Sequence, residues 1–378
     1  MANGTSSPPI ALDYAARPER ARLGVTERNF LRAGLYTAAI VFIFWCGYYF
    51  ERSILHRHPA DIRFIREASE AAMRYITIPH IVIGFLFMIS SPKNQNLRQR
   101  LWAAGLLIAG AALCTLYWKG GGKANLLLYS GVYLYFLVHE LRDEAMFYTV
   151  LGEAAPIADK TAFKGLVRWM TGLIVFTMGA FVWAPIPFGL YYKKLTEPTS
   201  ALANWATLNA SWLDGSMSLP LRIALSVTPF VLSAVGFAIV LRHFAARLKY
   251  PDVQTLFRNH AVLFKVMFGV AAVLGLSLIL TARAYSLILF HVVAWYIFAA
   301  YQFAKHPPKA PSQGWWTWMR TSVRGFKTLH IGMVVVLMAI GLVWTIGLDR
   351  TSSLAWLLAP ESFLYWTILH ITVSFVPR

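Results

Sequence analysis

Cysteine is almost absent from this chain, and charged residues are scarce. Only Cys46 and Cys114 occur among 378 residues, both inside apolar runs, so the sequence excludes a disulfide framework and a thiolate metal site. Charged residues make up 14% of the chain, against about 25% in soluble proteins, and 57% of the residues are hydrophobic. This composition predicts an integral membrane protein.

Familiar catalytic motifs are missing as well. The chain contains no HExxH motif of zinc proteases and no GxSxG motif of serine hydrolases. It also lacks the HxxxH and HxxHH boxes that are typical of membrane desaturases and hydroxylases. Any chemistry must therefore come from residues that are scattered along the sequence.

Apolar runs of membrane-spanning length recur along the chain. A transmembrane helix needs about 20 apolar residues, and ten runs approach this length: 33–50, 75–91, 101–118, 124–150, 166–192, 221–241, 261–282, 284–303, 328–347 and 352–376. They predict an all-α, polytopic membrane protein with about ten transmembrane helices in one bundle. Whether Arg283 splits two spans or lies within one is left open.

The basic residues predict the orientation of the chain. With the N-terminus inside, 22 of the 35 Lys and Arg residues fall in cytosolic segments and 12 in outer loops. The positive-inside rule then favours both termini in the cytoplasm, and we expect the membrane to be the inner membrane of a bacterium. Attraction to anionic lipid accounts for the net charge of +18 without a nucleic-acid partner.

The predicted domain organisation is simple. Residues 1–30 are polar and lack a signal peptide, so we expect a cytosolic tail followed by one transmembrane domain over residues 31–378. Amphipathic interfacial segments are expected near 51–74, 193–220 and 304–327, the last because it joins three tryptophans to basic residues.

A cluster of polar residues interrupts the run 124–150. Fifteen uncharged residues precede the cluster, too few to cross a bilayer alone, and another apolar stretch follows it. The run therefore predicts one helix with five polar side chains near its middle: His139, Glu140, Arg142, Asp143 and Glu144. Each such group costs at least ~2.5–3.5 kcal/mol at bilayer depth, so these residues are expected to face an internal functional site.

Helical geometry arranges four of these side chains on one broad face. At 100° per residue His139 stacks on Asp143, and Glu140 stacks on Glu144. Imidazole and carboxylate groups together bind Fe, Zn or Mn, and two carboxylates can bridge two metals. Arg142 points elsewhere, where it can neutralise a neighbouring helix or reach a lipid headgroup.

Four other apolar runs each contain one histidine. At ~1.5 Å per residue, His139 lies near the bilayer midplane, His291 about 10 Å from the outer end of its run, and His370 in the inner half of its own. His330 falls at a cytosolic end and His80 near an outer end, so the five imidazoles are not expected to bind one ion.

These positions define the predicted site. The expected metal ligands are His139, Glu140, Asp143, His291 and His370, and the expected metal is iron, with zinc or manganese as alternatives. The candidate catalytic residues are Glu140, Asp143 and Glu144. His80, His330 and Arg142 are expected to support the ligands or to form an alternative site.

Three functions remain open from the sequence. The first is a metal-dependent membrane oxidoreductase or oxygenase, most readily a non-haem iron enzyme, acting on a lipid or isoprenoid that enters from the bilayer. Such an enzyme needs an electron-donor protein or a substrate that supplies its own electrons, because no electron-transfer domain is recognisable. The second is a proton-coupled transporter that uses the His/Glu/Asp cluster. The third is a b-type cytochrome with histidines as axial haem ligands.

Overall fold

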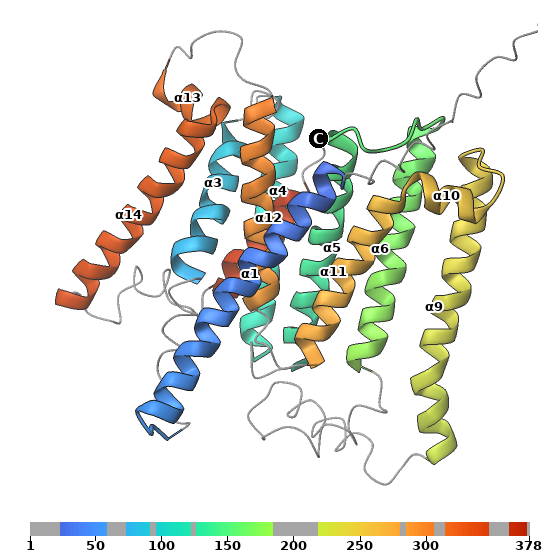
Figure 1. The fold of residues 1–378 in the computed structure, drawn as a ribbon, viewed down its shortest axis with the longest axis horizontal. Helices are drawn as coiled ribbons and strands as arrows, with labels where there is room; N and C mark the ends of the chain where they lie inside the picture. Colours follow the sequence, from blue (N-terminus) through green and yellow to red (C-terminus); the bar gives the residue numbers. More distant parts are fainter. Residues whose placement is uncertain are drawn as a thin grey trace, which may run out of the picture.

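The computed structural model describes residues 23–58, 73–90, 96–121, 126–183, 218–279, 285–305, 314–347 and 363–375. Every regular element in these ranges is a helix. In chain order they are α1 (Val25–Tyr49), η1 (Phe50–Ile54), η3 (Met73–Thr77), α3 (Ile78–Ile89), α4 (Leu97–Lys119), α5 (Leu126–Val150), α6 (Lys160–Trp183), α9 (Leu219–Arg247), α10 (Val253–Asn259), α11 (Ala261–Ile279), α12 (Tyr285–Lys305), α13 (Trp315–Thr321), α14 (Val323–Gly347) and α16 (Phe363–Ser374). The long helices form one bundle, with α9 at one edge and α14 at the other (Figure 1). The predicted all-α class is thus confirmed for the described residues.

Five helical segments are long and apolar enough to cross a membrane. They are Val25–Ile54, Leu97–Lys119, Ile223–Arg247, Ile288–Lys305 and Val323–Ile340. The number rises to six if α10 and α11, which are bent by 87° at a short break, are counted as one span. The structure is therefore compatible with an integral membrane protein that has five or six candidate spans among its described residues.

This number is lower than the ten spans predicted, although each of the ten apolar runs contains a helix. The helix α5 carries the polar cluster at its centre, which reduces its apolar character. The helices α3 and α16 have 12 described residues each, and α3 directly continues the π-helical turn η3. The described residues therefore confirm five or six candidate spans and not ten.

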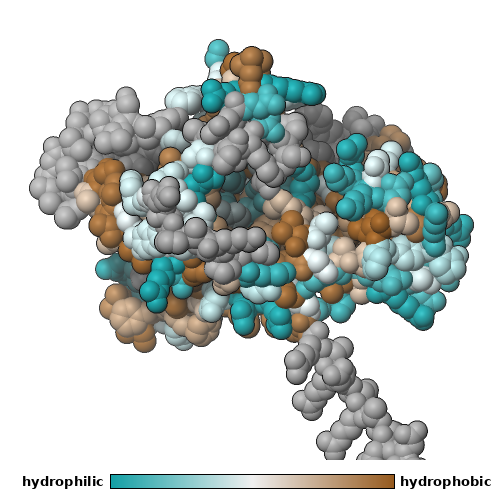
Figure 2. All heavy atoms as spheres, turned by 90° about the horizontal axis from the view of Figure 1, so that it is seen from above, coloured by the Kyte–Doolittle hydropathy of each residue, from teal (hydrophilic) through white to brown (hydrophobic). Residues whose placement is uncertain are grey.

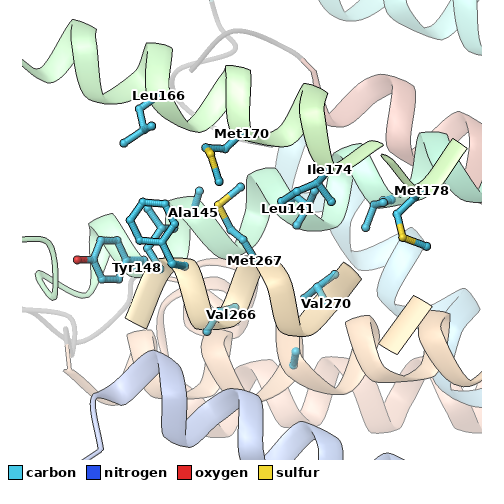
Figure 3. Packing of buried hydrophobic residues seen from close by; sticks show 14 of the residues in the cluster. Leu141, Ala145, Tyr148, Leu166, Met170, Ile174, Met178, Val266, Met267 and Val270 are labelled. Atoms are coloured by element: carbon cyan, nitrogen blue, oxygen red, sulfur yellow. The ribbon is translucent and has the colours of Figure 1, made fainter. Parts of the chain in front are cut away.

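A closely packed apolar core lies between α5, α6 and α11 (Figure 3). Leu141 and Tyr148 of α5, Leu166 and Met170 of α6, and Met267 of α11 have at most 1% of their surface exposed. Full burial of a large apolar side chain contributes ~1.5–3 kcal/mol relative to exposure. This core fixes the rotation of α5, and with it the direction in which the polar cluster of α5 points.

The tryptophan-rich segment predicted at 304–327 contains the short helix α13. Its Trp315 is 73% exposed whereas Met319 is buried, so the helix has one apolar face toward the protein and aromatic groups outside. The guanidinium of Arg320 donates a hydrogen bond to the carbonyl oxygen of Ser90, at the end of α3. This pattern suits a helix in the headgroup layer, and it ties α3 to the same end of the bundle.

The same end of the bundle holds the start of α1 (Figure 1). Viewed onto this end, hydrophilic residues gather over α10 and the adjoining end of α9 (Figure 2). Asp252 caps α10, where its Oδ1 accepts a hydrogen bond from the backbone N–H of Thr255 at 2.6 Å. This hydrogen bond holds the pKa of the Asp252 carboxyl below its usual value.

Several predicted features lie partly or wholly outside the described residues. They are most of the N-terminal tail (1–22), the parts 59–72, 193–217 and 306–313 of the three interfacial segments, and the segment around Arg283. Within the described chain α1 already begins at Val25, eight residues before the apolar run predicted from 33. The polar first turns of α1 extend the helix because Glu153 accepts a hydrogen bond from the backbone N–H of Thr26 at 3.0 Å.

Candidate metal centre

The polar cluster of α5 lies on one continuous helix, as predicted. The helix runs from Leu126 to Val150 without a break. His139 and Glu140 are buried, with 2% and 0% of their surface exposed, whereas the side chain of Asp143 is 18% exposed. The cluster therefore faces the protein interior and opens slightly on the side of Asp143.

Four histidines from four helices meet at this level of the bundle. They are His80 of α3, His139 of α5, His291 of α12 and His370 of α16. Their rings form a closed circuit with centroid separations of 5.4 Å (His80–His291), 4.9 Å (His291–His139), 5.2 Å (His139–His370) and 4.9 Å (His370–His80). Residues up to 290 positions apart in sequence are thus brought together.

Several ring nitrogens in this cluster have no hydrogen-bond partner among the described residues. They are both nitrogens of His80, Nε2 of His139 and Nε2 of His291. Buried polar atoms are nearly always partnered, and leaving one unpartnered costs about 1–3 kcal/mol. Imidazole nitrogens with free lone pairs, gathered in one buried place, are the donor set that a transition-metal ion binds.

Two histidines of the cluster are oriented by contacts to their Nδ1 atoms. Oε2 of Glu140 contacts Nδ1 of His291, and Oγ of Ser374 lies 3.0 Å from Nδ1 of His139. A carboxylate or hydroxyl that binds one imidazole nitrogen fixes the ring and its tautomer, and it leaves the other nitrogen for a metal. Glu140 and Ser374 therefore direct Nε2 of His291 and of His139 toward the cluster.

Two overlapping sets of ligand atoms have the spacing of a metal site. The atoms of His80, His291 and His370 lie within 4.8 Å of one another, and so do those of His139, Asp143 and His291. Ligand atoms on opposite sides of an ion with bonds of ~2.1 Å are about 4.2 Å apart. A shift of a few tenths of an ångström per side chain would let either set bind one ion.

The surroundings of His80 and His370 show how the rings are accommodated. Trp295 packs against the edge of His80 at 4.4 Å between ring centroids. A Cβ on Gly84 would lie 3.3 Å from Cε1 of His370, tighter than most real contacts. The glycine thus allows α16 to bring its imidazole close to α3.

The predicted ligands fall into two groups in the structure. His139, Asp143, His291 and His370 lie in the sets that can hold an ion. Glu140, which was also predicted as a ligand, instead lies with its carboxylate on the far nitrogen of His291.

The structure includes His80 in the circuit, whereas the sequence predicts that it lies apart from the other histidines, near one end of its apolar run. His80 lies in the first turn of α3, about 15 Å along the helix axis from Ser90, whose carbonyl oxygen accepts the hydrogen bond from Arg320.

The remaining predicted residues lie away from the imidazole circuit. Nδ1 of His330 contacts the hydroxyl of Tyr296, so this histidine already has a protein partner. Arg142 is exposed, and its guanidinium lies 4.3 Å from the ring centre of Phe375, in agreement with its predicted outward direction. Glu144 is buried and faces a separate small cavity beside α1.

Sequence reasoning missed Ser374, Trp295 and Gly84, all of which contact the cluster. Ser374 and His370 are four residues apart and so share a face of α16, as Trp295 and His291 share a face of α12. This spacing of four residues from a histidine was the sequence signal that could have identified Ser374 and Trp295.

Comparison of the chain with protein-family models, with curated proteins and with solved structures finds no match. The function is therefore inferred from the geometry of the four-histidine cluster itself.

Proposed function

We propose that this protein is a membrane metalloenzyme, a non-haem iron oxidoreductase that acts on a lipid or isoprenoid substrate. The observation that carries the proposal is the circuit of four imidazoles, which supplies two overlapping sets of closely spaced ligand atoms. Three of the four rings have buried nitrogens without a hydrogen-bond partner among the described residues. His80, His291, His370 and His139 would bind the ion, with Asp143 as the carboxylate nearest to them. Histidine-rich sites with a carboxylate suit iron, and they also suit zinc or manganese.

The spacing of the rings favours a bare ion over haem. A porphyrin needs a flat space between its two axial imidazoles. Here each ring has two other imidazoles within 5.4 Å, and Trp295 lies against His80. This crowding of the four imidazoles supports the binding of a small ion and not of a porphyrin.

The position of the cluster supports a hydrophobic substrate. His139 lies 11 residues from the end of α5, or about 16 Å along the helix axis. The partly exposed Asp143 and His370 lie on the α5–α16 side, where Tyr135 and Phe375 stack at 5.8 Å. A molecule dissolved in the bilayer reaches this aromatic surface directly. In an oxygenase reaction the electrons would come from a partner protein or from the substrate.

Metal content is the direct test of the proposal. Detergent-purified protein, prepared without chelators, should hold about one equivalent of iron and show no haem absorption band, because the converging nitrogens form one compact site. Elemental analysis and a visible spectrum measure both. Metal-free wild-type protein that retains its activity would rule out the metalloenzyme, and pH-dependent flux in such protein would identify a transporter instead.

The proposal includes ten membrane crossings with both termini in the cytoplasm of a bacterial cell. The partition of basic residues between the two sides of the membrane supports this. Reporter fusions after Lys123 and after Arg350 should therefore report the outer side of the membrane. A cytosolic signal from either fusion would contradict the ten-span arrangement.

A further inference from the structure

A small cavity lies where the start of α1 meets α5 and α12. Its volume is about 10 Å³, and its walls include Thr26 and Asn29 of α1, Glu144 and Phe147 of α5, and Phe298 of α12. A cavity of about 10–15 Å³ on this measure holds one particle of the size of a water molecule. The cavity is therefore large enough for a single small ligand.

Its polar side chains are buried, and two of them have no hydrogen-bond partner among the described residues. Thr26, Asn29 and Glu144 are 2%, 7% and 3% exposed. Oγ1 of Thr26 and Nδ2 of Asn29 make no hydrogen bond in the described part of the chain, and none of the ion pairs found there involves Glu144. A buried carboxylate without a cation costs several kcal/mol, so these groups together favour a positively charged ligand.

The side of the cavity formed by α1 is held in place. Oε1 of Glu153 accepts a hydrogen bond from the backbone N–H of Thr26 at 3.0 Å. A Cβ on Gly24 would lie 2.4 Å from that oxygen, so only glycine permits the contact. The Thr26 side chain therefore has a fixed position beside Glu144.

We propose that Glu144, Thr26 and Asn29 form a binding site for one monovalent cation of the size of sodium. One carboxylate supplies one negative charge, so a single positive charge balances it. Hydroxyl, carboxylate and amide oxygens are the ligands that hard cations prefer. Rotation of the Asn29 amide exchanges its two ends and presents Oδ1 to the cavity.

The cavity is distinct from the histidine cluster. Glu144 lies one turn along α5 from Glu140, and none of the residues that line the cavity is a member of the imidazole circuit. The inference therefore goes beyond the proposed enzyme activity and does not rest on it. A sodium effect is measurable whether or not the protein holds iron.

Thermal unfolding of the purified full-length protein tests the site. The midpoint should rise with NaCl concentration and reach a plateau, compared with choline chloride at equal ionic strength, because a ligand that binds only the folded state stabilises it. Thr26→Val removes one oxygen and keeps the shape of the side chain. It should weaken the apparent sodium affinity at least about tenfold, because the hydroxyl oxygen that would contact the cation is lost. Glu144→Gln should abolish the sodium dependence.

Thr37→Val is the matched control. Thr37 lies on the same helix, is 7% exposed and also has an unpartnered Oγ1, but it does not line the cavity. This variant should keep the wild-type sodium response, and both threonine variants should keep the wild-type metal content. Equal midpoints in NaCl and choline chloride would show that water alone fills the cavity and would overturn the proposal. Equal losses in the Thr26 and Thr37 variants would overturn it as well.

Discussion

Replacement of His80 by alanine should lower the affinity for the metal by more than about tenfold. Loss of a residue that only supports the ligands of a metal site already costs about 10–100-fold in affinity. Both ring nitrogens of His80 are buried without a hydrogen-bond partner, and the ring lies 4.9 Å from His370 and 5.4 Å from His291. No hydrogen bond to the described residues would be lost, so the variant should still insert and fold. Elemental analysis of the purified variant measures the effect.

His330→Ala provides the matched control for this experiment. His330 is also a histidine within an apolar helix, but its Nδ1 contacts the hydroxyl of Tyr296 and it belongs to neither set of ligand atoms. The variant should keep the wild-type metal content. If His80→Ala also kept it, or became more stable than metal-loaded wild type, the His80 ring would be a packing group and not a ligand. Removal of orphaned polar atoms alone can be neutral or stabilising.

Glu140→Gln should weaken metal binding by about 10–100-fold without unfolding the protein. The glutamine carbonyl can still accept a hydrogen bond from Nδ1 of His291, so the ring stays oriented while the negative charge is lost. Glu140→Ala removes both the charge and the contact and should bind metal more weakly still. Metal titrations of the two variants, followed by the metal content at each concentration, measure this order.

The order of the two variants distinguishes the possible roles of Glu140. A direct ligand would give equal and complete loss of metal in both, because an amide is a poor replacement for a carboxylate. A purely structural ion pair would instead destabilise the fold by ~3–5 kcal/mol in either variant, and wild-type protein would contain no metal. Glu51→Gln is a suitable control, since Glu51 is a buried carboxylate that pairs with Arg57 at 3.3 Å outside the site. It should leave metal binding unchanged.

The membrane character and the helical class of this protein follow from its composition. Long apolar runs and a low content of charge leave the helix as the structure that satisfies every backbone polar group without water. The sequence also places the polar cluster on one helix, because the apolar stretches on either side of it are each too short to span a bilayer. The i,i+4 relation of His139 and Asp143 then follows from helical periodicity, and their imidazole and carboxylate atoms lie 3.7 Å apart in the structure.

The lengths of the individual helices could not be derived in the same way. The run 75–91 predicts one regular helix, whereas in the structure the π-helical turn η3 precedes α3. Hydropathy also could not show that His80 meets the other histidines, because that contact depends on how α3 packs against α12 and α16. Hydropathy measures how apolar a segment is, but it does not reveal where the regular helix begins.

The sequence determined which polar residues lie within apolar helices, and the tertiary structure decided which of them meet. Periodicity fixes the face of a helix on which a histidine lies, but not the neighbouring helix or the axial offset between the two. Those depend on packing, such as the core of α5, α6 and α11 that sets the rotation of α5 (Figure 3). Packing brought His80 beside His370 and placed Glu140 on Nδ1 of His291. Packing also determined that Glu144 lies apart from the histidines and lines the cavity beside α1.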